Sequence, residues 1–395
     1  MNDMRVILDI GNGYVKWVIF GQEEGKPAIL AKEMVKTRGM RKGKILDIED
    51  FAVCINEVLE AFSKKLGGDF VEEVFLTVSH PQCHITRLYE QKRILNKQIG
   101  HDDVAHLSEV IADSADKPNY EVLKIVPVQW IIDEQTKTKD PIGMEARKLE
   151  LTADVFMVPK VFYNNVLEAC DKLDLHVADI IPTVLGAAEG CLDLDVRDLG
   201  VLLVDIGTNQ TSYVVYEEGY PLFYGVIPVG GEDVTKDISI GLQVDIKDAE
   251  HIKREKGVIL LDGMSAGEDT TIDKGFLSDI MVARYEQIFE IIQEDLQNHD
   301  KEWRLPGGVI IIGGGSKVEN ILLLAKDVFK LATFKGKDNI LRLGDISHNP
   351  QFLWLLGTWT WVEKYHQGKR GWFGVWLKFA TGLLSRVTDM FKHLF

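Results

Sequence analysis

The chain has 395 residues, of which 46% are hydrophobic and 27% are charged, a composition that excludes disordered and fibrous classes. Its net charge of −16 disfavours nucleic acid as a partner, because an acidic surface repels the phosphate backbone. The charge is uneven: from Lys369 onward, five Lys and Arg against one Asp give +4, which leaves −20 for the body. This asymmetry predicts a basic tail with its own partner.

Four widely spaced cysteines form no C-x-x-C pair, which favours a reducing compartment over a disulfide framework or a zinc module. The N-terminal residues lack the pattern of a signal peptide, and no apolar run approaches the ~20 residues that span a bilayer. We therefore expect a cytoplasmic protein without a transmembrane helix.

Two segments of the chain share one pattern, in which an apolar strand ends in Asp, a Gly-containing turn follows, and a second strand begins. The first copy spans residues 6–20 and the second spans 201–216. Such a long repeat distance predicts two related α/β domains.

Apolar periodicity predicts the other elements. In chain order, these are a helix at 47–65, a strand at 73–79, an inserted α+β domain at 84–159 (strands 123–132 and 148–159, helix 102–112), helices at 160–173, 234–242, 246–256 and 277–298, a strand at 307–316 that ends in three glycines, and a helix at 351–365.

The two Gly turns carry the strongest chemical signal. Glycine lets backbone N–H groups approach a ligand closely, and successive N–H groups suit phosphate oxygens. Asp9 and Asp205 would repel each other across a shared cleft unless a hard dication lay between them, which predicts Mg²⁺ bound through water together with a nucleotide. The first set is Asp9, Gly11, Asn12, Gly13 and Lys16; the second is Asp205, Gly207, Thr208, Asn209 and Gln210.

Two further motifs complete this prediction. Lys16, early on the second strand, could reach a β or γ phosphate, although an edge-strand lysine would look the same. The run Gly313, Gly314, Gly315, Ser316 would let the backbone lie flat against an aromatic base and start a helix at Ser316; the alternative is an ordinary helix N-cap after a buried strand.

In this order, the motifs resemble the phosphate-1, phosphate-2 and adenosine motifs of the actin-like ATPase superfamily, although Thr208 and Asn209 replace the usual glycines. The resemblance implies that Glu250 meets the ribose and Lys253 the adenine of ATP. A solvated helix face would carry the same two charges.

Within the superfamily, segments 42–48, 139–149, 228–238 and 349–352 resemble the bacterial cell-division family FtsA. The resemblance implies an actin-like two-domain ATPase fold of duplicated ribonuclease-H-like domains, with an inserted α+β subdomain and a C-terminal amphipathic helix. The implied parts are IA (1–83, 160–198 and 331–366), IC (84–159), IIA (199–228 and 305–330), IIB (229–304), a linker (367–371) and a membrane-targeting helix (372–395).

One position departs from the pattern of filament-forming relatives such as MreB. The segment 181–188 resembles their connecting helix, whose first residue is a Glu that orients the attacking water. Here Ile181 takes its place and cannot accept a proton. Glu189 lies two helical turns further on. We therefore expect ATP binding with at most slow hydrolysis.

The basic tail forms an amphipathic helix when it is placed on a helical wheel, with one aromatic and aliphatic arc and one polar, cationic arc. This pattern favours a helix that lies in an anionic membrane interface. A terminal helix docked on the body is the alternative. The membrane candidates are Trp372, Phe373, Trp376, Phe379, Leu383, Leu384, Val387 and Phe391, with Lys378, Arg386 and Lys392.

The resemblance to FtsA also implies a function and partners: self-polymerisation on the cytoplasmic face of the plasma membrane at the division site, binding of the C-terminal peptide of the tubulin-like protein FtsZ, and recruitment of later division proteins. Arg284 matches the arginine that contacts the peptide, although a solvated helix arginine would look the same.

Two alternatives stay open. A pilus-assembly scaffold like PilM shares the fold and the inserted domain but does not need the terminal helix. A sugar or acetate kinase of the same superfamily would need a catalytic Asp beside a substrate loop, and we find none in the first domain.

Overall fold

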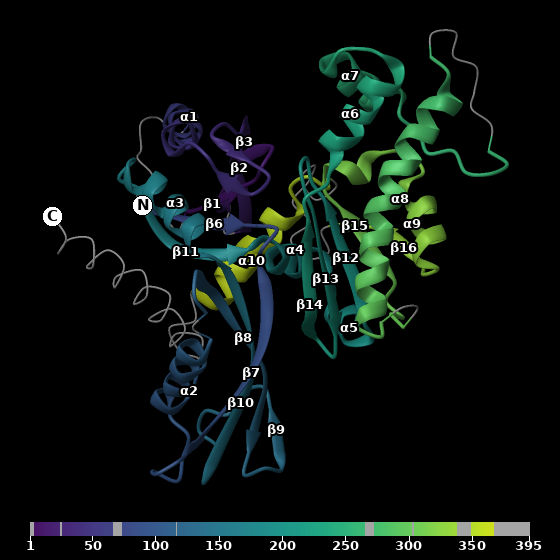
Figure 1. Ribbon diagram of the computed structural model, residues 1–395. Coiled ribbons are helices and arrows are strands. Elements are labelled where there is room, and N and C mark those ends of the chain that lie inside the picture. Colours follow the sequence, from purple (N-terminus) through teal and green to yellow (C-terminus); the bar gives the residue numbers. More distant parts are fainter. Residues whose placement is uncertain are drawn as a thin grey trace. The chain divides into compact units, whose positions relative to one another are not determined.

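The computed structural model describes residues 4–23, 26–65, 73–115, 117–264, 272–301, 304–337 and 349–366. The described chain forms two compact units (Figure 1). The first unit contains the described residues up to Gly186, except Arg41–Gly43, and also Gly357–His366. The second contains Arg41–Gly43 and Ala187–Leu356.

The first unit is built on a five-stranded sheet with the order β11-β6-β1-β2-β3. The pairs β1–β6 and β6–β11 are parallel, whereas β1–β2 and β2–β3 are antiparallel. The elements are β1 (Arg5–Ile10), β2 (Tyr14–Glu23), β3 (Lys26–Lys36), β6 (Glu73–Val78) and β11 (His176–Pro182), with α1 (Ile48–Lys65), α3 (Lys160–Asp171) and the short β5 (Lys44–Ile45). Two further elements are divided between the units: β4 (Met40–Arg41) begins in the first and ends in the second, and α10 (Leu353–His366) begins in the second and continues from Gly357 in the first.

Helices cover both faces of this sheet. Trp17 of β2 is fully buried and stacks on Phe62 of α1, with 3.6 Å between the ring centroids. Phe20 packs against Trp359 of α10, with 5.4 Å between the ring centroids. Because side chains alternate along a strand, α1 and α10 lie on opposite faces. The predicted helix at 47–65 is present, and Asp47 begins it by accepting the Asp50 N–H at 3.0 Å.

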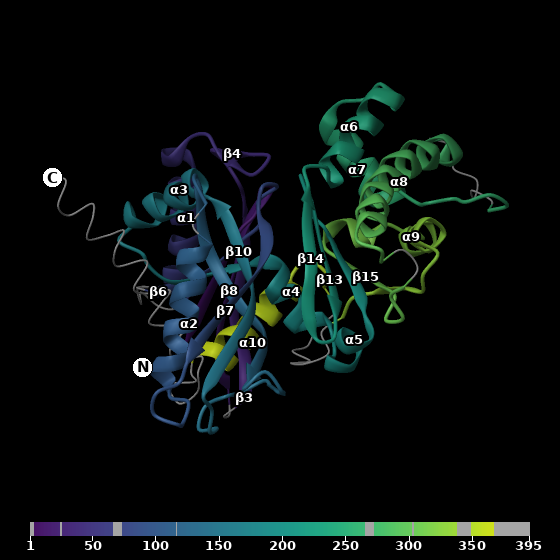
Figure 2. The same cartoon turned by 60° about the horizontal axis from the view of Figure 1, so that its bottom comes forward.

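A smaller four-stranded sheet with the order β7-β10-β8-β9 forms the insert (Figure 2). Alternate residues of β10, among them Leu149 and Leu151, are buried in one core with Val104 and Leu107 of the helix α2. The fold therefore contains the predicted α+β insert, although we did not foresee β7. The elements are β7 (His84–Arg93), α2 (His101–Ser114), β8 (Tyr120–Ile132), β9 (Thr136–Thr138) and β10 (Lys148–Pro159).

The second unit repeats the sheet of the first. Its order is β14-β13-β12-β15-β16, with β12–β15 and β15–β16 parallel and β12–β13 and β13–β14 antiparallel. Strand order and directions match those of the first sheet, which confirms the predicted duplication. The strands are β12 (Val201–Ile206), β13 (Thr211–Glu217), β14 (Tyr220–Ile227), β15 (Val309–Ile312) and β16 (Thr333–Lys335).

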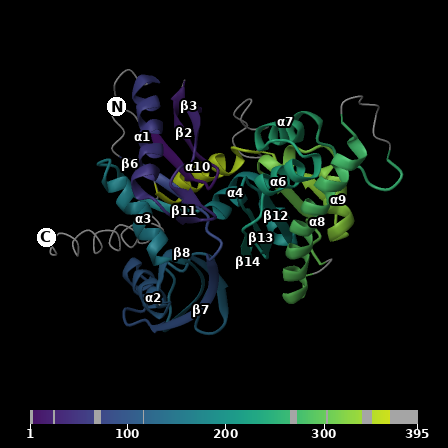
Figure 3. The same cartoon turned by 45° about the horizontal axis from the view of Figure 1, so that its top comes forward.

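The helices of this unit pack around one core. Tyr285 and Phe289 of α8 are fully buried with Val204 of β12, and the ring centroids of Phe289 and Phe329 of α9 lie 5.4 Å apart. Figure 3 shows α8 and α9 side by side in this unit. The helical elements are α5 (Leu194–Leu199), α6 (Gly231–Leu242), α7 (Ile246–Lys256), α8 (Lys274–Asn298), the 3₁₀ turn η1 (Gly314–Lys317) and α9 (Ile321–Phe329); α4 (Thr183–Cys191) begins in the first unit and ends in the second.

The helix start expected at Ser316 was wrong. Ser316 lies inside η1, and α9 begins only at Ile321. Val318 is extended and Asn320 has a left-handed backbone with φ of 64°, so no α-helix can run through these two residues. The subdomain boundaries given above stay predictions.

The buried ion pair between Arg197 and Glu189 provides a test of the second unit's packing. Arg197 Nη1 lies 2.8 Å from Glu189 Oε1, while Arg197 Nη2 donates to the Ala188 carbonyl and Nε donates to the Leu192 carbonyl. Arg197→Met removes the cation beside the buried Glu189 carboxylate and should lower the free energy of unfolding by about 3–5 kcal/mol, measured by denaturant titration. The additional substitution Glu189→Leu should restore most of the lost free energy of unfolding, because it removes the buried carboxylate.

The matched control is the exposed pair of Lys330 and Asp327, 2.8 Å apart. Lys330→Ala should change the free energy of unfolding by less than about 0.5 kcal/mol. Equal losses in Arg197→Met and in the double variant would contradict the buried-pair argument.

Candidate functional site

The first hairpin holds its carboxylate at the buried end of β1. Asp9 is 5% exposed and lies opposite Lys16 in the β1–β2 register, with 3.5 Å between Lys16 Nζ and Asp9 Oδ2. Thr77 of β6 donates its hydroxyl to Asp9 Oδ1 at 3.2 Å. The structure therefore places Lys16 and Thr77 beside Asp9.

The turn of this hairpin requires glycine. A Cβ on Gly11 would lie 2.5 Å from the carbonyl oxygen of Tyr14. Thr37 fixes the turn from β3's side, because its hydroxyl donates to the Gly11 carbonyl at 2.7 Å and its N–H to the Gly13 carbonyl at 3.1 Å. Asn12, between the two glycines, is buried. Sequence reasoning missed Thr37 and Thr77; a polar residue inside the apolar run of β6 was the available signal for Thr77.

Burial raises the pKa of Asp9 to about 6, against the lowering effects of Lys16 and the Thr77 hydrogen bond. The carboxylate form is thus poorly solvated even with an ammonium beside it. A further cation near this group would stabilise the charged form.

The second hairpin occupies the equivalent place in the second unit. Asp205 is the penultimate residue of β12, as Asp9 is of β1. A Cβ on Gly207 would lie 2.8 Å from the Gln210 carbonyl, so this turn also requires a residue without a side chain. The buried Oδ1 atom of Asn209 has no hydrogen-bond partner among the described residues, and Thr208 is exposed.

The glycine run lies directly against this hairpin. β15 pairs in parallel with β12, and a Cβ on Gly313, whose φ is +85°, would lie 2.2 Å from Asp205 Oδ1. Gly315 is held as closely to Ile206. Ser316 turns inward and donates to the Gly313 carbonyl at 2.8 Å. Residues 205–210 and 313–316 therefore form one cluster.

The first turn of α6 closes the cluster from another side. The N–H of Gly231 donates to the Gly207 carbonyl at 2.9 Å, and the N–H of Glu232 donates to the Thr208 carbonyl at 2.7 Å. A Cβ on Gly230 would lie 2.7 Å from both carbonyls. The backbone of α6 thus sets the position of the second hairpin.

Glu250 and Lys253 of α7 are brought together beside α6, with 2.6 Å between Lys253 Nζ and Glu250 Oε2. Lys253 also donates to the Gly231 carbonyl and to Thr235, both at 2.7 Å. Burial lowers the pKa of Lys253. Both residues therefore lie next to the α6 turn that holds the second hairpin, although they already pair with each other.

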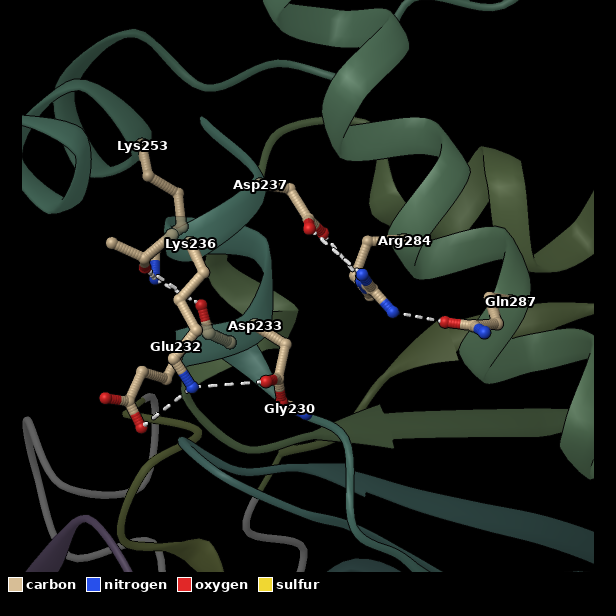
Figure 4. A network of polar contacts seen from close by, with 10 residues as sticks. Gly230, Glu232, Asp233, Lys236, Asp237, Lys253, Arg284 and Gln287 are labelled. Atoms are coloured by element: carbon tan, nitrogen blue, oxygen red, sulfur yellow. Dashed lines mark hydrogen bonds and ion pairs between the residues drawn. The ribbon is translucent and has the colours of Figure 1, made fainter. Parts of the chain in front are cut away.

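Arg284 lies on α8 and bridges to α6 (Figure 4). Its Nε is 2.6 Å from Asp237 Oδ2 and its Nη2 is 3.0 Å from Asp237 Oδ1, and it also donates to Gln287. The hydrogen bond to Asp237 raises the pKa of the guanidinium. The arginine predicted to bind a peptide thus already has a carboxylate partner, with 28% of its side chain exposed.

Apolar side chains extend the surface around Arg284. Ile240 at the end of α6 is 76% exposed, and Phe276 at the start of α8 is 45% exposed. Ile280 lies between them against Gly241, where a Cβ would come within 2.5 Å of Ile280 Cδ1. We call this set, with Asp237, Arg284 and Gln287, the α6–α8 surface.

The start of α4 carries no acid. Ile181 is fully buried at the end of β11, and Glu189 is engaged in the buried pair with Arg197. In the part of the chain that the structure describes, three or more His, Cys, Asp and Glu side chains never gather closely enough to hold a metal.

The tail residues with predicted membrane roles, at 372–395, and the linker at 367–371 lie outside the described residues. Along the described part of the chain, every helix is too short or too polar to cross a bilayer.

Two family models match this chain. "Cell division protein FtsA" matches residues 202–357, and "SHS2 domain inserted in FTSA" matches residues 82–157, so that together they cover more than half of the sequence. The chain belongs to the FtsA family. The match to the SHS2 domain falls on the insert that carries β7 to β10.

Curated FtsA proteins are similar to this chain along most of their length. FtsA of Bacillus subtilis (strain 168) is 27% identical over 365 residues, which cover 89% of this chain and 82% of that protein. FtsA of Pseudomonas aeruginosa (strain PAO1) is 26% identical over 361 residues, which cover 88% and 86%.

Solved structures show the same actin-like fold. The PilM-PilN type IV pilus biogenesis complex superposes with a TM-score of 0.64 at 18% identity and covers 90% of this chain and 98% of that one. MreB 5 of Spiroplasma citri bound to AMPPNP superposes with a TM-score of 0.57 at 13% identity and covers 93% and 98%. At these identities the likeness concerns the fold alone.

The raised pKa of Asp9 predicts a pH-dependent effect of Asp9→Asn. The folded state holds the proton up to about pH 6, whereas the unfolded carboxyl releases it near 3.8. The stability due to this proton is therefore full below pH 3.8 and is lost as the pH rises through 6. Relative to the wild type, Asp9→Asn should gain roughly 2–3 kcal/mol between these limits and level off above them.

Urea titrations of nucleotide-free protein at pH 4, 5, 6 and 7.5 measure this difference. Asp327→Asn, in an exposed pair, serves as the control and should show a small difference at each pH. A difference between Asp9→Asn and the wild type that falls with rising pH would contradict the assignment.

Proposed function

We propose that this chain binds ATP, polymerises on the cytoplasmic face of the plasma membrane at the division site, tethers FtsZ filaments there and recruits later division proteins. The observation that carries the proposal is the membership of the FtsA family. It is supported by two equivalent sheets, in each of which the central strand carries an Asp near its end and is followed by a glycine turn.

The residues of both units fit a nucleotide. The Gly11 and Gly207 turns exclude side chains from the hairpins, and Asn209 presents a buried polar atom without a protein partner in the described structure. Asp205 and the Gly313 backbone lie in contact, where a base or ribose could be held. ATP would supply the phosphates, and Mg²⁺ their neutralisation; Asp9 and Asp205 would hold the cation through water.

Hydrolysis is not the chemistry that this chain favours. Ile181 has no proton acceptor, and the carboxylate of Glu189 is committed to Arg197. A general base must reach the water that it activates. We therefore propose that bound ATP acts mainly by stabilising one conformation, with turnover that is slow at most.

The α6–α8 surface suits a short peptide that presents an acidic group and apolar side chains. Arg284 supplies the cation, and Ile240 and Phe276 supply exposed apolar area beside it. An FtsZ C-terminal peptide is the occupant that we propose. The same family membership supports the proposed self-association into filaments.

The tail supplies the membrane contact. Its aromatic arc would enter the interface of the bilayer, while Lys378, Arg386 and Lys392 would meet anionic headgroups. The linker at 367–371 is short, so the body would be held close to the lipid.

A PilM-like scaffold is the alternative function, and the structural likeness to PilM is one of fold. The terminal helix separates the two hypotheses, because a scaffold of that kind does not need it.

Co-sedimentation with anionic vesicles tests the proposal. The full chain should pellet with phosphatidylglycerol-containing vesicles, and a chain that ends at residue 371 should stay in the supernatant, because the apolar arc that enters the membrane is gone. Lys378→Gln with Arg386→Gln and Lys392→Gln should keep the arc but weaken binding, by about 1 kcal/mol per charge.

Vesicles of phosphatidylcholine alone serve as the control for charge, and equal melting temperatures of the two chains show that the body is intact. Undiminished binding of the truncated chain would sink the membrane-anchor hypothesis and favour the scaffold.

Peptide binding by Arg284 can be separated from its contact with Asp237. Arg284→Ala should weaken the binding of a labelled FtsZ C-terminal peptide at least about tenfold in fluorescence anisotropy, because a partly desolvated charge pair is lost. Asp237→Asn keeps the guanidinium and removes its internal competitor, so it should bind the peptide as tightly as the wild type or more tightly. Equal weakening in both variants would mean that the pair only braces the helices.

A further inference from the structure

The three parallel strands of the first unit end in one row. In the register, Ile10 lies beside Val78, and Val78 lies beside Pro182. The next residues of β1, β6 and β11 are Gly11, Ser79 and Thr183, which we call the strand-end row. Ligands of open α/β sheets bind at the carboxyl ends of such strands.

Thr183 holds an unusual position in this row. Only 6% of the residue is exposed, and its buried hydroxyl oxygen has no hydrogen-bond partner in the described part of the chain. A buried hydroxyl without a partner lowers the stability of the folded state, whereas valine has the same shape and would not. Within the described residues, Thr183 therefore carries a buried polar group without a protein partner.

The same residue begins a helix. Thr183 is the first residue of the nine-residue α4, so it lies at the helix end where the first-turn N–H groups have no carbonyl partner within the helix. These N–H groups and the helix dipole favour a negatively charged ligand. Two independent features of one residue therefore point to an anion.

The candidate site residues are divided between the two units, and this division bears on which part of the nucleotide we assign to Thr183. The groups proposed for the ribose and the base, Glu250, Lys253 and the run at 313–316, all belong to the second unit. The first unit contributes the Gly11 turn and Lys16, which suit phosphate. Thr183 lies two strands beyond β1, roughly 10 Å from Gly11 at the usual strand spacing. Within the first unit, Thr183 is the member of the strand-end row that lies furthest from the Gly11 turn, and we assign to it the phosphate furthest from that turn.

We propose that the Thr183 hydroxyl donates a hydrogen bond to an oxygen of the terminal phosphate of ATP and so lets the protein distinguish ATP from ADP. The inference rests on the proposed nucleotide binding. Thr183 is a specificity residue: its hydroxyl orients the phosphate, and with Ile181 beside it in the chain no carboxylate there takes a proton from water. The site is thereby suited to sensing the triphosphate.

The test compares the full-length wild type with Thr183→Val and Thr183→Ser. Calorimetric titrations with Mg-ATP and Mg-ADP give both dissociation constants, and melting curves without nucleotide give stability. Thr183→Val should weaken ATP binding about tenfold, the effect of one hydrogen bond to a charged group, and should change ADP binding less than about twofold. Thr183→Ser should restore the preference for ATP.

The melting temperature without nucleotide distinguishes a ligand-binding role of Thr183 from a purely structural one. Without nucleotide, Thr183→Val should melt at the same temperature as the wild type or higher, because the unpaired hydroxyl is removed. The control is Ser278→Ala in α8, which removes a buried hydroxyl that accepts the Leu260 N–H at 2.8 Å and so leaves that N–H without this partner. It should melt lower and leave both nucleotide affinities unchanged.

Two failures are distinguishable. If the wild type does not bind ATP, or if Asp205→Ala binds it fully, the proposed nucleotide site fails and this inference fails with it. If the wild type binds ATP but Thr183→Val keeps the same ratio of ATP to ADP affinity, or melts lower and loses both ligands equally, only the role of Thr183 is overturned.

Discussion

The cost of burying a carboxylate at the end of a central strand is the constraint on which the candidate site depends. Asp9 is almost wholly buried, and an ammonium and a hydroxyl in contact with it do not return its pKa to the ordinary range. Such a group needs further positive charge to ionise fully. The glycine turn that follows it provides the room for a ligand that would bring that charge. Asp205 holds the equivalent position on β12, where it is half-buried and the close backbone of Gly313 limits what can lie beside it.

Much of this arrangement is predictable from local pattern. A strand that ends in Asp before a glycine turn identifies both hairpins, and helical spacing identifies α1 and α7 within a residue or two. The rest depends on partners distant in the sequence. Thr37 and Thr77 reach the first hairpin from β3 and β6, and nothing near Gly11 or Asp9 in the sequence signals them.

The missed helix boundary after Ser316 has a similar cause. A serine after three glycines is typical of a helix start, and the local pattern is correct in that a helical turn does follow. The left-handed backbone at Asn320 then interrupts it, and Asn320 is held there by donating to the Ile259 carbonyl at 3.0 Å, a contact with a loop some sixty residues earlier in the chain. Tertiary contact overrides local preference.

The two arginine–carboxylate pairs of the second unit differ in burial, and this difference separates a structural pair from one that can exchange its partner. Arg197 and Glu189 are almost fully buried, and three hydrogen bonds hold the guanidinium, so an exchange of partner would leave a charge in the core. Arg284 and Asp237 have equally good geometry but are about a quarter exposed, where a pair contributes little to stability. A carboxylate from a peptide could replace Asp237 at small cost, because water can solvate the displaced group. Since Asp237 lies on the helix whose first turn is hydrogen-bonded to the Gly207 and Thr208 carbonyls, one rigid element joins the exchangeable pair to the second hairpin.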